Sequence, residues 1–224
     1  VLKTFKYRIY PTASQRRLMT QTLEECRWLY NHTLEERKLA WEEHQESLSY
    51  FAQNRALTGL KNERVSLQIV HSQVLQNVLV RVDLAMKAFF RRVKAGEEPG
   101  YPRFRGAGQY DSFCYPQAPS GCKLEGDHLT LSKIGTVRVA LHRPLEGTPK
   151  TVCIRRSSTG KWFATFSCEV DPVPLPPLDN AVGIDVGLAS FAALSTGEQI
   201  ENPRFFRQEE KALGRAQRRL SKEA

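Results

Sequence analysis

The sequence predicts a multidomain α+β protein in which an antiparallel β-barrel carries an inserted helical bundle and precedes the start of an α/β domain. Alternating apolar and polar residues, typical of strands, occupy residues 3–10 and most of 110–170, and helical periodicity fills the segment between them. A proline-rich stretch, residues 171–177, then precedes a short apolar run around one aspartate. We expect the barrel at residues 1–11 and 106–175, the helical domain at 12–105 and the last domain at 179–224.

The composition indicates a polyanionic partner. The 224 residues include 33 Lys and Arg against 24 Asp and Glu, a formal net charge of +9. Nucleic acid is favoured over a membrane, because no segment approaches the roughly 20 apolar residues that a membrane span requires. The first residues contain no signal-peptide segment, so we expect a cytoplasmic, nucleoid-associated prokaryotic protein. The chain starts at Val instead of Met, which favours an excerpt of a longer protein.

The cysteines predict neither a disulfide framework nor a zinc site. They are five in number, scattered along the chain and never spaced Cys-x-x-Cys. This usage also fits a reducing, cytoplasmic compartment.

Residues 3–10 are expected to form a half-buried strand with a basic outer face. Phe5, Tyr7 and Ile9 share one face, and Lys6 and Arg8 share the other. The basic face suits a phosphate backbone, although strand faces are often basic for solubility alone. Both interpretations stay open.

Three helices are expected between the strands. Residues 12–15 have the spacing of a capping box for a first helix that continues past Trp41. Helical patterns follow at residues 50–63 and 67–94. The third helix carries an apolar stripe of Leu75, Val78, Val82, Ala85, Phe89 and Val93. Such stripes indicate a protein core, so residues 12–94 are expected to form a small helical bundle.

A short extended segment follows the bundle. Arg103 and Arg105 flank Phe104 directly after Pro102. Guanidinium groups contact phosphates and aromatic rings stack on bases, so the segment suits single-stranded or irregular nucleic acid. Strands are then expected near residues 111–115, 123–131, 135–141, 151–156 and 162–170. Joined by hairpins, they can form a compact barrel that the first strand of the chain closes.

Asp185 interrupts the apolar run after the proline-rich connector, between Gly183 and Gly187. A carboxylate in a buried strand needs a partner that offsets its desolvation, and a divalent metal ion is the obvious one. The Gly-Ile-Asp-x-Gly pattern resembles the first strand of the ribonuclease-H-like fold, which metal-dependent nucleases share with sugar-kinase-like ATPases. The alternative is a strand-end aspartate that caps its own turn.

The last helix favours the nuclease interpretation. It is expected at residues 208–222, and a broad basic side is formed by Arg207, Lys211, Arg215, Arg218 and Arg219. Such a helix suits a polynucleotide path, not a small sugar pocket. The residues after Asp185 also lack the Gly-Thr-rich phosphate hairpin of a sugar kinase.

In order along the chain, these features resemble the TnpB (OrfB) family of transposon-encoded RNA-guided DNA endonucleases, which are related to type V CRISPR effectors. The resemblance rests on Leu-Gln-Asn at 75–77, Phe-Phe-Arg-Arg-Val-Lys at 89–94, Pro-Arg-Phe-Arg at 102–105, Gly-Ile-Asp-Val-Gly-Leu at 183–188 and Asn-Pro-Arg-Phe-Phe at 202–206. It implies a wedge barrel, a recognition bundle and the start of a RuvC, ribonuclease-H-like nuclease domain.

The resemblance also implies roles for particular residues. Asp185 would be the first catalytic acid and would bind Mg²⁺ or Mn²⁺. The surface that reads the motif beside a double-stranded DNA target would comprise Tyr50, Gln76, Ser112, Phe113, Tyr115 and Gln117. Guide RNA, or its duplex with the target, would contact Arg103, Phe104, Arg105, Arg207, Arg215, Arg218 and Arg219, with Lys6, Arg8 and Lys211 adding positive charge. The sequence leaves the oligomeric state open.

The family's second and third acids and its zinc ribbon lie beyond the basic helix, so they have no counterparts among these residues. Two-metal hydrolysis needs carboxylates from several strands. We therefore expect this segment alone to be inactive as a Mg²⁺-dependent endonuclease. A nuclease-dead RNA-guided DNA-binding protein, acting as a repressor, and a transposase that joins DNA strands are the alternatives.

Overall fold

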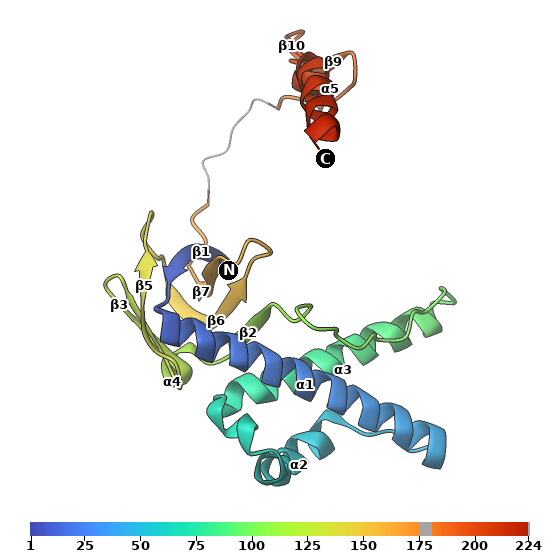
Figure 1. Cartoon of the computed structure of the whole chain (residues 1–224), viewed down its shortest axis with the longest axis vertical. Helices are drawn as coiled ribbons and strands as arrows, with labels where there is room; N and C mark the ends of the chain where they lie inside the picture. The colour runs from blue at the N-terminus through green and yellow to red at the C-terminus, as the bar shows by residue number, and fades with distance from the viewer. Residues whose placement is uncertain (175–180, 224) are drawn as a thin grey trace. The chain divides into compact units, whose positions relative to one another are not determined.

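The structure, a computed structural model, describes residues 1–174 and 181–223. Residues 175–177 of the expected proline-rich connector therefore lie outside the described residues. The chain divides into two compact units, Val1–Pro172 and Val173–Ala224, and each is described by itself. Figure 1 shows the elements in chain order.

The first unit contains a seven-stranded antiparallel sheet with the strand order β2-β6-β7-β1-β5-β4-β3. The strands are β1 (Leu2–Tyr10), β2 (Ser112–Tyr115), β3 (Cys122–Glu125), β4 (His128–Leu131), β5 (Gly135–Ala140), β6 (Thr148–Arg156) and β7 (Trp162–Glu169). β1 pairs with β7 on one side and with β5 on the other. The first strand therefore joins two groups of strands that come much later in the sequence.

The sheet curls into a nearly closed barrel. Its edge strands β2 and β3 are connected by the short helix α4 (Ala118–Gly121), and no ladder pairs them among the described residues. Phe5, Tyr7 and Ile9 point into the core, as their alternation predicts. Tyr7 meets Phe166 of β7 edge-on, with the ring centroids 5.8 Å apart. Each fully buried side chain of this size contributes about 1.5–3 kcal/mol to folding.

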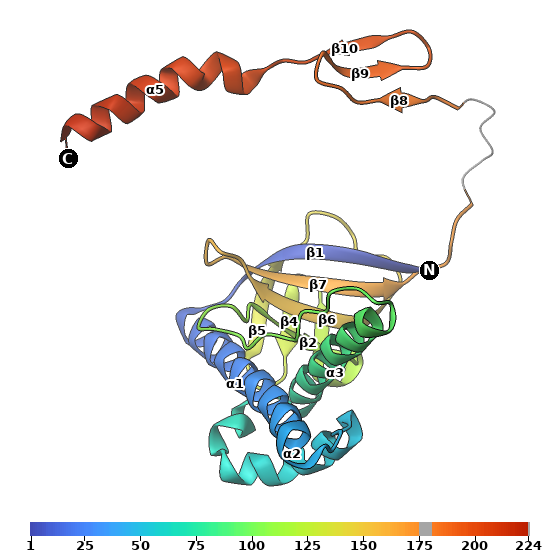
Figure 2. The ribbon, with the colours of Figure 1, turned by 90° about the vertical axis from the view of Figure 1, so that its right-hand side faces the viewer.

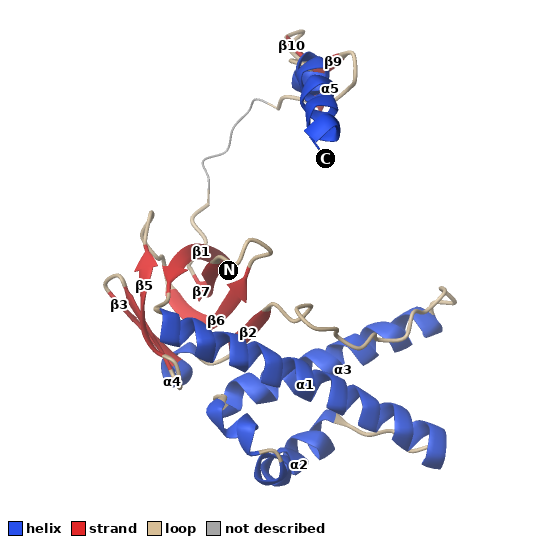
Figure 3. Ribbon diagram, in the orientation of Figure 1, coloured by secondary structure: helices blue, strands red, loops and turns tan. Residues whose placement is uncertain are grey.

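Three helices are inserted between β1 and β2, as expected: α1 (Ala13–His44), α2 (Tyr50–Glu63) and α3 (Ser72–Lys94). They gather on one side of the unit, while β1 and β7 lie on the other (Figures 2 and 3). The predicted capping box is present, because the Gln15 amide donates to Thr12 Oγ1 and the Thr12 amide donates to Gln15 Oε1. It fixes the exit of the chain from the barrel into α1.

The third helix begins later than the periodicity predicts. Leu67 is fully buried but belongs to a separate 3-10 helix, Val65–Ile69, and Val70 is extended. The apolar stripe continues across this break because it reports which residues face the core, not the local backbone geometry. Its later part leaves the core: Val93 is exposed, and Phe89 packs on Tyr101 with the ring centroids 5.4 Å apart.

The expectation of no disulfide is wrong. Cys114 of β2 and Cys153 of β6 lie directly opposite each other in the ladder and form one. Strand register brings them together across 39 positions, which cysteine spacing does not encode. Cys26, Cys122 and Cys168 are free and buried. Burial raises the pKa of the Cys26 and Cys122 thiols to about 12, so neither is a reactive thiolate at neutral pH.

The second unit contains a small antiparallel sheet, in the order β10-β9-β8, and one helix. Its elements are β8 (Ile184–Asp185), β9 (Ser190–Leu194), β10 (Gln199–Glu201) and α5 (Phe205–Glu223). Ile184 remains 64% exposed and Leu188 93% exposed. The expected strand pair is present, but the expected burial of β8 is not, because no second layer covers it within the described residues. The RuvC-like identity of this sheet stays a prediction.

Candidate nucleic-acid interface

The segment after α3 is held against α1 by its backbone. Asn31 of α1 accepts from the Arg105 amide at 2.7 Å and donates to the Arg105 carbonyl at 3.0 Å. The Arg105 guanidinium lies 5.6 Å from the centroid of the Tyr30 ring. Arg103 and Phe104 remain exposed. One asparagine thus replaces the strand partner that this extended segment lacks and presents an arginine and an aromatic ring to solvent.

Lys6 and Arg8 lie on the outer face of β1, as predicted. Both reach over the ring of Phe163 on β7, at 4.5 Å for Lys6 Nζ and 5.3 Å for the Arg8 guanidinium carbon. Neither pairs with a carboxylate among the described side chains. Their positive charge is therefore ordered by an aromatic ring and left uncompensated.

The six residues expected to read the target motif do not share one surface. Phe113 and Tyr115 point into the barrel and are each 1% exposed. Ser112 is partly buried, and its carbonyl accepts from Arg81 of α3 at 2.8 Å. Gln117 is exposed, and its amide oxygen accepts from Gln73 of α3 at 2.9 Å. Gln76 and Tyr50 are partly buried on α3 and α2. The surface that these residues offer consists of Gln117 and parts of Ser112, Gln76 and Tyr50.

Arg81, Gln73 and Asn31 organise this region, and no sequence pattern predicts their roles. Arg81 donates to the Tyr110 hydroxyl at 3.2 Å and to Cys114 Sγ at 3.0 Å, in addition to the Ser112 carbonyl. Gln73 also donates to Ser120 Oγ at 2.7 Å. Single polar residues on helices carry no recognisable pattern, because their partners lie tens of positions away. Only the fold identifies them.

A partly buried ion pair connects α1 to α3 in the bundle. Arg37 donates to Asp83 at 3.3 Å and to Gln53 of α2 at 2.8 Å, and Lys87 contacts Asp83 at 2.9 Å. Burial acts to raise the pKa of Asp83, but Lys87 and Arg37 outweigh it and lower that pKa. The carboxylate is charged at neutral pH, so this arginine supports the fold instead of a ligand.

Asp185 is exposed in β8, opposite Ala193 of β9. The strand is held by Gly183, whose amide donates to Ser195 Oγ at 2.9 Å and whose carbonyl accepts from the Ser195 amide at 2.8 Å. Within the described residues no group of three His, Cys, Asp or Glu side chains could hold a metal ion. The described donors therefore do not make a metal site by themselves, and Asp185 alone does not fit one.

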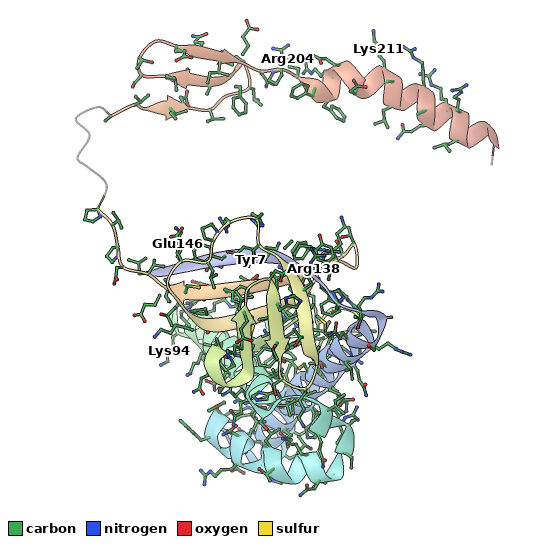
Figure 4. All side chains as sticks on the ribbon, turned by 90° about the vertical axis from the view of Figure 1, so that its left-hand side faces the viewer. Tyr7, Lys94, Arg138, Glu146, Arg204 and Lys211 are labelled. Atoms are coloured by element: carbon green, nitrogen blue, oxygen red, sulfur yellow. A yellow bond between two sulfur atoms is a disulfide. The ribbon has the colours of Figure 1, made fainter. Side chains whose placement is uncertain are left out.

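The helix α5 has two unlike faces. The predicted basic residues Arg207, Lys211, Arg215, Arg218 and Arg219 are all exposed. Phe206, Leu213 and Leu220 recur every seven residues, on one side of the helix, and are also exposed. Figure 4 shows Arg204 at the entry to α5 and Lys211 on it. A pocket of about 910 Å³ lies where β9 and β10 meet the start of α5, lined by Leu188, Phe191, Ile200 and Phe206, among others.

No helix in the described part of the chain is long and apolar enough to cross a membrane.

Comparisons with known proteins define the class. A model of an OrfB-type helix-turn-helix domain matches residues 1–46, and an OrfB model described as a probable transposase matches residues 165–224. In the structure, the first match covers one strand and the whole of a single 32-residue helix instead of a helix-turn-helix. Both matched models describe parts of OrfB proteins.

Two curated relatives cover almost the whole chain. A putative RNA-guided DNA endonuclease of Streptomyces pristinaespiralis is 36% identical over 100% of this chain and 56% of its own length. The putative RNA-guided DNA endonuclease InsQ of Escherichia coli is 33% identical over 99% of this chain and 54% of its own length. The chain belongs to the TnpB (OrfB) family, and it spans about half the length of these relatives.

A solved Cas12f1–sgRNA–target DNA complex also resembles the chain, with a TM-score of 0.44 and 11% identity over 99% of this chain and 62% of that chain. At this level the likeness carries no argument about the fold.

Proposed function

We propose that this chain is the guide-RNA-binding and target-DNA-recognising part of an RNA-guided, metal-dependent DNA endonuclease encoded by an insertion sequence. One observation carries the proposal: both relatives that match along almost the whole chain are named putative RNA-guided DNA endonucleases. The two units supply suitable surfaces. The first presents Lys6, Arg8 and Arg103, and the second presents the basic face of α5.

Asp185 would be one carboxylate of the hydrolytic centre. Bound Mg²⁺ or Mn²⁺ would activate the attacking water and stabilise the leaving oxygen. Since Asp185 has no companion ligands among the described residues, the centre needs acids from elsewhere in the whole protein, where the resemblance also expects a zinc ribbon. The motif-reading surface would comprise Gln117, Gln76, Ser112 and Tyr50.

One alternative function would use the same surfaces. A protein that binds guide RNA and target DNA but does not cut would need the same surfaces and no further acids.

Cleavage by the product of the complete native gene distinguishes these functions. The protein is purified with its bound RNA and incubated with a plasmid that carries the RNA-matched sequence, in Mg²⁺ or in EDTA. We expect cutting in Mg²⁺ only. Asp185→Ala should reduce it by at least about a hundredfold, since metal-ion catalysis contributes several kcal/mol to the rate.

Glu201→Ala is the matched control, because Glu201 is an exposed carboxylate of the same small sheet. Its cutting rate should equal that of the wild type. RNA-dependent binding to the plasmid without cutting would exclude the endonuclease function and support the DNA-binding alternative. Equal activity of Asp185→Ala and wild type would remove Asp185 from the catalytic centre.

A further inference from the structure

The outer face of β1 and β7 combines two cations with two aromatic side chains, and solubility alone does not require this combination. Lys6, Arg8 and Tyr10 follow one another at every second residue of β1, and Phe163 lies directly opposite Arg8 on β7. Tyr10 is 55% exposed. The helices α1, α2 and α3 lie on the other side of the unit and do not cover this face (Figure 2).

The cations on this face are positioned but not neutralised. The Phe163 ring holds both Lys6 and Arg8, and the Arg8 guanidinium also lies 5.4 Å from the centroid of Tyr10. Arg8 Nη1 is buried and has no hydrogen-bond partner in the described part of the chain. A buried donor without an acceptor costs about 1–3 kcal/mol, so the present neighbours of Arg8 leave the hydrogen bonding of its guanidinium incomplete.

Neighbouring arginines behave differently. Arg155, opposite Phe163 on β6, contacts Asp111 at 2.7 Å. Arg138, opposite Tyr10 on β5, lies 3.5 Å from Asp127 and is labelled in Figure 4. Carboxylates therefore compensate the two sides of the face and leave its centre, Lys6 and Arg8, available to an anion.

We propose that the outer face of β1 and β7 binds an unpaired stretch of single-stranded nucleic acid, with phosphates on Lys6 and Arg8 and one base stacked on Tyr10. Phe163 acts as a positioning residue that orders the two cations. An exposed ring beside ordered cations on a strand surface is the arrangement that single strands use, because an unpaired base offers a free face. A base inside a duplex is already stacked on both sides. The proposal rests on the proposed function and adds the kind of strand that this face takes.

The test measures fluorescence polarisation of labelled oligonucleotides with the complete chain. The probes are oligouridylate, oligodeoxythymidylate of the same length, an abasic strand and a duplex. Tyr10→Leu should weaken binding of the base-containing single strands about tenfold and leave the abasic strand unchanged. Trp41→Leu is the matched control, because Trp41 is also 55% exposed but lies at the end of α1; its affinity should not change.

The charge contribution is measured through salt. Lys6→Ala with Arg8→Ala should lower the slope of log affinity against log salt by about 1.4 on single strands. Lys123→Ala with Lys150→Ala removes the same charge from lysines that have carboxylate partners, and should leave the slope unchanged. Phe163→Leu should lower the slope in part, because the ring that orders the two cations is lost. Phe163→Tyr should keep the slope of the wild type, because the aromatic ring of tyrosine still orders them.

The outcomes separate this proposal from the proposed function. Strong binding of single strands with no effect of Tyr10→Leu, or an equal effect on the abasic strand, would overturn the stacking face alone. Failure to bind any nucleic acid would overturn both proposals. Tighter binding of oligouridylate than of oligodeoxythymidylate identifies RNA as the source of the strand, and the reverse identifies DNA.

Discussion

The two units of the chain use the same residue types in opposite ways. In Val1–Pro172, large apolar side chains such as Phe5, Leu75 and Phe166 are fully buried. In Val173–Ala224, Phe206, Leu213 and Leu220 are at least half exposed, and Ala192 is the one apolar residue that the described part of this unit buries fully. Burial therefore stabilises the first unit, whereas hydrogen bonds within a short sheet and a helix hold the second together.

The arginines differ in the same way. Arg37, Arg64 and Arg81 of the first unit bind carboxylates, carbonyls or side chains of their own unit. Among the described side chains of the second unit, no cation contacts a carboxylate. The formal charge of +9 nevertheless lies wholly in the first unit, because residues 173–224 contain seven Lys and Arg and seven Asp and Glu. Arginine counts alone do not locate a nucleic-acid interface.

The largest expected difference between the units is in stability. Leu75→Ala leaves a cavity in the core and should lower the free energy of unfolding by about 3 kcal/mol, measured by urea denaturation followed by circular dichroism. Leu213→Ala is the same change on the exposed stripe of α5 and should cost less than about 0.5 kcal/mol. A loss at Leu213 as large as that at Leu75 would mean that this stripe is buried in solution, and would break the comparison.

A smaller effect is expected from the ion pair that connects α1 to α3. Asp83→Asn should lower the free energy of unfolding by about 2 kcal/mol at pH 7, because it removes the carboxylate that Arg37 and Lys87 contact. The folded state depresses the pKa of Asp83, so this stabilisation is fully present above the ordinary carboxyl pKa, near 3.9, and disappears as the pH falls through the depressed value. Urea denaturation over this acidic range should show wild type and variant converging.

The control for this prediction is an acid of the second unit. Glu201→Gln changes an exposed carboxylate without a cationic partner in the described structure, and should leave stability unchanged at every pH. A difference between Asp83→Asn and wild type that persists at low pH would show that the amide disrupts packing instead of charge.

Sequence periodicity predicted what depends on neighbouring residues. The inward face of β1, the capping box at Thr12 and the bounds of α2 follow from local alternation and capping, and the structure confirms them. Register and pairing depend on distant residues. The sequence therefore did not predict the Cys114–Cys153 disulfide or the hydrogen bonds between Asn31 and the Arg105 backbone. The inward direction of Phe113 and Tyr115 escaped it for the same reason, since a strand's buried face is set by its partners.

For the strand that carries Asp185, the chemical motif was predictable from the sequence but the burial was not. Its motif was recognisable from residues 183–188 without any knowledge of the fold, yet its expected burial is absent from the described structure. A chemical motif constrains which side chains are present, whereas burial requires a second layer of structure to cover them. The apolar residues around the sheet and along α5 are exposed because no second layer covers them in the described structure.

The smallest predicted effect tests whether the exposed arginines of α5 contact nucleic acid. The double variant Arg215→Ala with Arg218→Ala should lower the slope of log affinity against log salt for RNA binding by about 2. Each phosphate contact that is lost reduces the number of counterions released on binding. The Lys123→Ala and Lys150→Ala pair, whose lysines contact Glu125 and Glu169, removes equal charge from the first unit and should leave the slope unchanged. An equal change in both double variants would mean that net charge, not the basic face of α5, governs binding. The difference between paired and exposed cations would then matter for folding but not for nucleic-acid binding.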